Sequence, residues 1–222
     1  MKIYKFFLST IFLMVIVTII ALNAEANLQT IGTATYNSTD YNLIYDTDLN
    51  ITWLDYTNAA NSWDNQVSWA SGLNTGGVLT YNFNSGVSMN WSGDWRLPTS
   101  LNQDGSGPCG GYNCTGSEMG HLYYSELGNS AGYGGFTNTG DFANLQTVDY
   151  WSGTEDTTRA DWSWLFLASN GEQFSYYKYL DSDAIAVRSG QLAVVPEPIS
   201  STLFIVGGAT LGFRQFRKKF KK

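Results

Sequence analysis

The strongest local structural signal in the chain is Trp162-Ser-Trp-Leu-Phe-Leu-Ala-Ser-Asn-Gly-Glu-Gln-Phe-Ser-Tyr-Tyr-Lys-Tyr179. Two runs rich in aromatic and aliphatic residues flank Asn170-Gly171. Both turn residues accept positive φ, and such a pair is typical of a β-hairpin. Further strand-like runs follow on either side, so the region predicts a small antiparallel set of strands at 150–154, 162–168, 173–179 and 184–188.

The remaining elements are expected before this hairpin. Thr/Asn-rich residues 27–41 are a lead-in strand or loop, and 100–116 and 128–141 are Gly/Asn loops. Two helices kept apart from antiparallel strands indicate an α+β domain. The expected order is strand 43–46, turn 47–50, strand 51–54, a helix at 63–73 capped by Ser62, strand 78–83 and a helix at 117–127.

Charge is segregated along the chain. The net charge is −7, yet residues 27–195 hold four strong bases against 17 acids, a net charge of −13. Six further bases, and no acid, lie in residues 214–222. Nucleic-acid binding needs a basic folded face, so this composition excludes it. All 8 Trp lie between Trp53 and Trp164, which supplies enough apolar area for a core.

The first 26 residues have the pattern of a secretory signal peptide. A basic start precedes an apolar run at 6–22, and Ala24 and Ala26 occupy the two positions that signal peptidase reads. The alternative is an uncleaved anchor, since 17 apolar residues are near the lower limit for a membrane span. Both interpretations predict export.

The C-terminal residues form a tripartite sequence. Pro196-Glu197-Pro198 ends a linker at 191–198, an uncharged apolar segment covers 199–213, and the basic tail is 214–222. Fifteen helical residues reach about 22 Å, less than the ~30 Å hydrocarbon core. The positive-inside rule places the tail in the cytoplasm. We expect a short transmembrane helix that acts as a sorting signal.

This order resembles the PEP-CTERM sorting signal of Gram-negative bacteria. The resemblance implies recognition by an exosortase, an inner-membrane cysteine protease/transpeptidase, in a setting of exopolysaccharide production. It also implies an inner-membrane intermediate held by the C-terminal helix before processing. The final location would then be the cell surface or the extracellular matrix.

Three motifs within 42–190 resemble the DUF1566 domain, also called the Lcl C-terminal domain. They are Gly93-Asp-Trp-Arg-Leu-Pro-Thr99, Tyr150-Trp-Ser-Gly-Thr-Glu155 and Ala186-Val-Arg188. The family is named after a collagen-like adhesin that binds sulfated polysaccharides, and it is similar to the C-type-lectin-like superfold. The resemblance implies that fold and, by analogy, polysaccharide binding. Its structural motif residues are Trp95, Arg96, Leu97, Pro98, Trp151, Glu155 and Arg188.

Arg96 has two interpretations. It pairs with an acid, such as Glu155, or it contacts an anionic ligand bidentately. Its neighbours Trp95 and Leu97 favour the structural role, because buried charges are normally paired. Arg188 follows an apolar run, and we interpret it in the same way.

Cys109 and Cys114 are the only cysteines. In an exported chain they favour a disulfide that pins the loop around them. A zinc site of the Cys/His type needs four ligands, and the chain offers two Cys and one His.

Asp46, Asp48 and Asn50 place three oxygen side chains at alternate positions, as in the first half of an EF-hand loop. Ile51 and Thr57 stand where that loop needs Gly and Glu, which excludes an EF-hand. A looser Ca²⁺ site remains as an alternative to a polar hairpin turn, which we favour. No other cofactor is expected.

Catalytic patterns are weak. Glu118 and His121 could share a helix face, but no Gly-x-Ser-x-Gly elbow accompanies them. Glu155 and Asp156 would point to opposite faces of a strand, which suits glycoside hydrolysis poorly. We therefore expect a protein that is not an enzyme.

Aromatic side chains remain as the lead to function, since sugar faces stack on Trp and Tyr. The alternation of a strand puts Trp162 and Trp164 on one face, and likewise Tyr177 and Tyr179. We expect these four to form the glycan-binding candidate, with Trp63, Trp91 and Tyr176 as further candidates and most other rings in the core. The expected function is a surface or exopolysaccharide-matrix protein that binds glycan without catalysis. The alternative is a structural biofilm protein with no glycan affinity.

Overall fold

The computed structural model describes residues 27–193. The predicted signal peptide, Pro-Glu-Pro motif, membrane helix and basic tail lie outside these residues. Within 27–193, no helix combines the length and apolar character needed to cross a membrane. The elements are β1 (Leu28–Tyr36), β2 (Thr39–Asp46), β3 (Ile51–Asn61), α2 (Trp63–Gly72), β4 (Thr80–Phe83), β5 (Met89–Arg96), α3 (Glu118–Gly120), the π-helix η1 (His121–Glu126), β6 (Asp149–Glu155), β7 (Trp162–Leu167), β8 (Glu172–Tyr177) and β9 (Ser182–Leu192).

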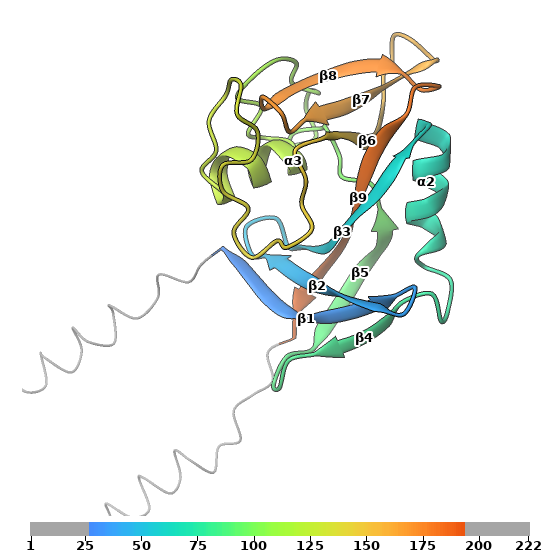
Figure 1. Cartoon of the computed structure of the whole chain (residues 1–222), viewed down its shortest axis with the longest axis vertical. Coiled ribbons are helices and arrows are strands. Elements are labelled where there is room, and N and C mark those ends of the chain that lie inside the picture. The colour runs from blue at the N-terminus through green and yellow to red at the C-terminus, as the bar shows by residue number, and fades with distance from the viewer. Residues whose placement is uncertain (1–26, 194–222) are drawn as a thin grey trace, which may run out of the picture.

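The expected α+β composition is confirmed, but the strands form one sheet instead of several small ones. The nine strands follow the order β4-β1-β2-β3-β9-β6-β7-β8, with β5 paired to β9 beside this path. Every pairing is antiparallel except the β6–β9 contact between Tyr150 and Asp183. Figure 1 shows β9 running through the middle of the molecule between the two halves of the sheet.

The central position of β9 corrects the prediction that residues 184–188 extend the C-terminal antiparallel set. β9 pairs with β3 and β5, and β8 is left at an edge. Its Ala184-Ile-Ala-Val187 run is buried on both faces. A strand covered on both faces needs apolar residues at consecutive positions, which explains a run without alternation.

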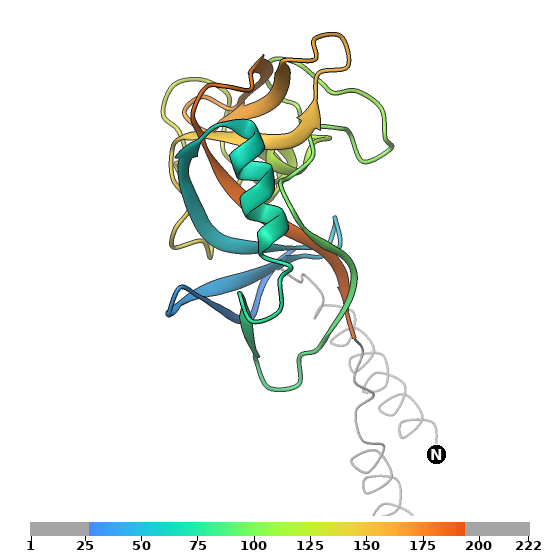
Figure 2. The same cartoon turned by 90° about the vertical axis from the view of Figure 1, so that its right-hand side faces the viewer.

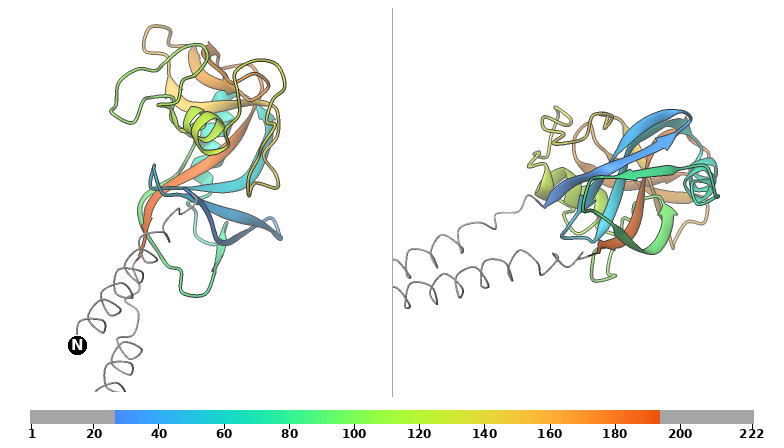
Figure 3. Two further views of the ribbon diagram at one scale, coloured as in Figure 1. Left: turned by 90° about the vertical axis from the view of Figure 1, so that its left-hand side faces the viewer. Right: turned by 90° about the horizontal axis from the view of Figure 1, so that it is seen from below.

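The two helices cover opposite faces of the sheet. Figure 2 shows α2 in front of the strands, and the left view of Figure 3 shows α3 in front from the other side. Ile185 and Val187 point toward the α3–η1 core, whereas Ala184 and Ala186 point into the clusters on the α2 side. The alternation of one strand therefore serves two cores.

The helix boundaries match the predicted ones closely, but the predicted capping hydrogen bond of Ser62 is absent. α2 begins after Ser62, whose side chain makes no capping hydrogen bond. Ser117 does cap α3, since its hydroxyl accepts from the Gly120 N–H at 3.1 Å. Beyond Gly120 the helix continues in π geometry, for which the sequence carries no recognised signal.

The hairpin at Asn170-Gly171 forms, but with a longer turn. β7 and β8 pair from Trp162↔Tyr177 to Leu167↔Glu172, so four residues connect them. Gly171 has φ 83°, whereas Asn170 is not among the residues with positive φ. Four-residue loops are commonly built around a type I turn, which places the glycine last.

The disulfide between Cys109 and Cys114 is confirmed. The loop that it closes also pairs with β8, because Gly111 and Gln173 exchange backbone hydrogen bonds of 2.7 and 2.9 Å. Residues 28–36, within the expected lead-in, form β1 and pair with β2 and β4.

Candidate functional site

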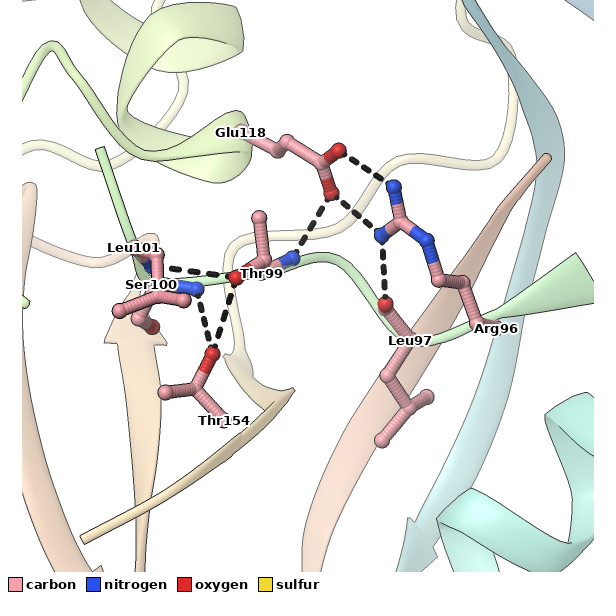
Figure 4. A network of polar contacts seen from close by, with 7 residues as sticks. All are labelled: Arg96, Leu97, Thr99, Ser100, Leu101, Glu118 and Thr154. Atoms are coloured by element: carbon pink, nitrogen blue, oxygen red, sulfur yellow. Dashed lines mark hydrogen bonds and ion pairs between the residues drawn. The ribbon is translucent and has the colours of Figure 1, made fainter. Parts of the chain in front are cut away.

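Arg96 forms a bidentate ion pair with Glu118, not with Glu155. Its Nη1 and Nη2 lie 2.7 Å from the two carboxylate oxygens of Glu118, and Nη1 also donates to the Leu97 carbonyl. Glu118 accepts a third hydrogen bond from the Thr99 N–H (Figure 4). Both terminal nitrogens of Arg96 thus donate to partners within the protein, which supports the structural interpretation.

The three sequence motifs meet around this ion pair. Trp95 is opposite Arg188 in the β5–β9 register, and the Gly153 N–H donates to the Pro98 carbonyl at 2.8 Å. The Thr154 hydroxyl accepts from the Ser100 N–H, as Figure 4 shows. The motifs therefore join β5, β6 and β9 into one framework.

The other motif residues also serve the framework. Trp95, Leu97 and Trp151 are buried in the core. Arg188 donates to the Gly93 carbonyl at 2.8 Å and lies against the Trp91 ring at 4.6 Å. Glu155 forms its ion pair with Lys178, which also lies over Trp63.

Asp46, Asp48 and Asn50 form a hydrogen-bonded turn. Asp46 Oδ1 accepts from the Asp48 and Leu49 N–H groups, and Asn50 Oδ1 accepts from the Tyr45 hydroxyl. Asp48 Oδ2 accepts from Asn27. Each of the three side chains therefore accepts at least one hydrogen bond, and those of Asp46 and Asn50 come from the turn itself or the residue before it, as in a polar hairpin turn.

Three of the four predicted glycan-binding side chains form a continuous row of rings. Trp162 and Tyr177 are directly opposite each other, with ring centroids 4.4 Å apart. Tyr179 continues the row at 5.3 Å from Tyr177 and is 70% exposed. Tyr176 is exposed as well and lies 5.8 Å from Trp162. The row thus runs from a half-buried indole out to solvent.

Trp164 does not join the row. It is opposite Ser175, and its ring packs against the Gly110 backbone in the disulfide loop. Trp63 is buried, donates to the Ser152 carbonyl and lines a pocket of about 620 Å³ beside α2. Trp91 packs among the rings of Tyr81, Phe83 and Trp95.

A polar network holds the inner end of the row. Arg159 lies 3.8 Å from the Trp162 centroid and forms an ion pair with Asp156 at 2.6 Å. Asp156 also accepts from Thr158 and Ser175. These hydrogen bonds, led by that of the Thr158 hydroxyl, hold the pKa of Asp156 well below its usual range. Trp162 is therefore fixed in place on one ring face.

Sequence reasoning missed a second polar cluster. His121 Nε2 lies 3.0 Å from Glu126 Oε1 and 3.8 Å from Asp48 Oδ2. A carboxylate oxygen of Asp46 lies within 4.8 Å of the ligand atoms of His121 and Glu126. Burial raises the pKa of the Asp46 carboxyl to about 6. Glu118, the expected neighbour of His121, turns to Arg96 instead. No short-range pattern announces the cluster, because its members come from two distant segments.

Comparisons with known proteins give no match to this chain, whether with models of protein families, with curated sequences or with solved structures.

Proposed function

We propose that this protein is an exported, non-catalytic glycan-binding component of the cell surface or the exopolysaccharide matrix. The observation that carries the proposal is the row Trp162–Tyr177–Tyr179, which leads from a fixed indole to an exposed phenol. Contiguous rings left in water cost free energy, and such surfaces commonly mark interaction sites. The apolar faces of successive sugar rings fit this row.

Export and sorting rest on the sequence patterns. Ala24 and Ala26 supply the signal-peptidase site, and Pro196-Glu197-Pro198 with its apolar and basic followers supplies the exosortase signal. The short apolar segment at 199–213 would hold the protein at the inner membrane until processing. The C-type-lectin-like fold is part of the same proposal, supported by the way the Gly93–Thr99, Tyr150–Glu155 and Ala186–Arg188 motifs join three strands.

The charge around the row favours neutral sugar faces over sulfate or carboxylate groups. Arg159 and Lys178, the bases of this region, are paired with Asp156 and Glu155. Arg96 is paired with Glu118, and Arg188 is bound to a carbonyl and a ring. No strong base in residues 27–193 is thus free to bind an anion bidentately. We expect binding that persists in EDTA, because the proposed site binds sugar through aromatic rings and not through a Ca²⁺ ion.

Co-sedimentation with the exopolysaccharide of the producing organism tests the proposal. The full-length chain, purified in a mild detergent, would be mixed with increasing polysaccharide in calcium and in EDTA. We expect saturable binding under both conditions. Absence of binding in both would reject glycan recognition for that polymer and leave the structural role. Binding only with calcium would move the site from the rings to the Asp46 turn.

A further inference from the structure

The Asp46 carboxyl is buried and only half satisfied. Its side chain is 0% exposed, and Oδ1 accepts from the Asp48 and Leu49 N–H groups. Oδ2 has no hydrogen-bond partner within residues 27–193. A buried carboxylate oxygen without a partner is costly, so native structures rarely keep one without a reason.

The surrounding groups carry excess negative charge. Asp46, Asp48 and Glu126 surround the single imidazole of His121, and the ligand atoms of Asp46, His121 and Glu126 all lie within 4.8 Å of one another. Among residues 27–193, no Lys or Arg forms an ion pair with these three carboxylates. Even a protonated His121 leaves the group negative, so the cluster favours a cation.

Local backbone geometry creates the His121–Glu126 contact. In an α-helix of 3.6 residues per turn, side chains five positions apart point roughly 140° away from each other. In η1 the Leu127 N–H instead donates to the Leu122 carbonyl, five residues back. This widened turn brings Glu126 to 3.0 Å from His121. π-turns of this kind occur frequently at functional sites.

We infer that Asp46, His121 and Glu126 form a binding site for a divalent metal ion of the Zn²⁺ class, which links the β2–β3 turn to η1. Three protein ligands leave the fourth position of a tetrahedral ion to a water molecule, and the Asp48 carboxylate, 3.8 Å from His121 Nε2, adds negative charge beside the site. Ligand atoms at 2.0–2.2 Å from Zn²⁺ lie about 3.3–3.6 Å apart. His121 Nε2 and Glu126 Oε1 lie 3.0 Å apart, close to this value, and Asp46 completes the group within 4.8 Å.

The choice of ion follows from the donor set. Calcium and magnesium take oxygen ligands, whereas imidazole nitrogen suits zinc and its transition-metal neighbours. This site differs from a calcium loop at Asp46, Asp48 and Asn50, because the Asn50 side chain faces Tyr45. An ion can reach it from solvent, since Asp48 and His121 line an open pocket of about 620 Å³.

Metal titration of the full-length chain tests this inference. The protein would be purified without a polyhistidine tag, with its disulfide intact, and stripped with EDTA before calorimetric titration with ZnCl₂. We expect one equivalent to bind, and the melting midpoint to rise by about 5–10 °C at a hundredfold excess over Kd. Ca²⁺ and Mg²⁺ should give smaller shifts, and bound Co²⁺ should show visible absorption.

Variants assign the ligands. Glu126→Gln preserves the volume of the side chain and a hydrogen bond to His121, and it should weaken Zn²⁺ binding at least tenfold, as should His121→Ala. Asp104→Asn is the matched control, because Asp104 lines the same pocket outside the cluster, and it should leave affinity unchanged. Circular dichroism would check that each variant is folded. The inference fails if the wild type binds no Zn²⁺ at about 1 mM, if Ca²⁺ binds more tightly, or if folded Glu126→Gln binds like the wild type.

Discussion

Within residues 27–193, two tryptophans have an arginine against the ring, and the rings beside them lead in opposite directions. Arg188 lies over Trp91, and the rings next to Trp91 lead inward to Trp95, which is 1% exposed. Arg159 lies over Trp162, and the adjoining rings lead outward to Tyr179. The rings Trp91 and Trp95, here called the inner row, end in the core. The rings Trp162, Tyr177 and Tyr179, here called the outer row, end in water.

The two rings with an arginine against them serve different roles, Trp91 in the core packing and Trp162 in the proposed glycan site. Both arginines have a hydrogen-bond partner within the protein, Arg188 in the Gly93 carbonyl and Arg159 in the Asp156 carboxylate. An arginine against an indole is therefore common to both places, and the direction of the adjoining ring row distinguishes them. We expect substitutions along the inner row to change stability and those along the outer row to change glycan affinity.

The largest effect on stability is expected at Trp95, in the inner row. Trp95→Ala removes a buried indole and the hydrogen bond that it donates to the Tyr81 hydroxyl. The free energy of unfolding should fall by about 3–5 kcal/mol, as measured by urea unfolding followed by circular dichroism. A loss below about 1 kcal/mol would contradict its place in the core.

A smaller effect on stability is expected from Asp156→Asn, which weakens the network that holds Arg159 over Trp162. At neutral pH we expect a loss of about 1–2 kcal/mol, because charge-assisted hydrogen bonds are broken. The lowered pKa of Asp156 means that its contribution is complete above the ordinary value of 3.8 and is lost as the pH falls below it. Melting midpoints of variant and wild type should therefore converge between pH 5 and about pH 2. A gap that widens on acidification would contradict this.

Substitutions in the outer row should change the affinity for polysaccharide and leave the stability of the protein unchanged. Tyr179→Ala removes its most exposed ring and should weaken polysaccharide binding about five- to tenfold, which corresponds to about 1–1.4 kcal/mol. The free energy of unfolding should stay within about 0.5 kcal/mol of the wild type, because the side chain is 70% exposed. Loss of stability without loss of affinity would place Tyr179 with the inner row.

The smallest effect is expected at Tyr133. It is exposed, at 101%, and contacts none of the rings of the outer row within the described chain. Tyr133→Ala should leave both stability and binding unchanged, which distinguishes a row of rings from any exposed phenol. Equal losses for Tyr133→Ala and Tyr179→Ala would remove the basis of this distinction.

Much of the fold could be predicted because its signals are local. The Asn170-Gly171 hairpin and the helices at 63–73 and 117–127 depend on residues within a few positions of one another. The central placement of β9 depends on which strands cover it, although its unbroken apolar run signals burial on both faces. β5 escaped prediction, yet Met89, Trp91, Gly93 and Trp95 alternate with polar residues and would have indicated a strand.

The site could be predicted only where side chains follow strand alternation. Alternation predicted that Tyr177 and Tyr179 share a face, and their rings do lie together. The Trp162–Tyr177 contact comes from the β7–β8 register, which alternation within one strand does not give. Trp164 was assigned to the same role, but its ring lies beside Gly110 of the disulfide loop, a long-range contact, and not beside the other rings. The Glu118 partner of Arg96 and the Asp46–His121 cluster likewise join distant segments, so no spacing in the sequence reveals them.

The most direct test of glycan recognition is a polysaccharide-binding isotherm of the full-length wild type beside the double variant Tyr177→Ala/Tyr179→Ala, with Tyr133→Ala as control. We expect saturable binding by the wild type and the control, and at least a twentyfold weaker isotherm for the double variant, with melting midpoints that agree. Superimposable isotherms for all three folded proteins would contradict the assignment of the outer aromatic row as the glycan site.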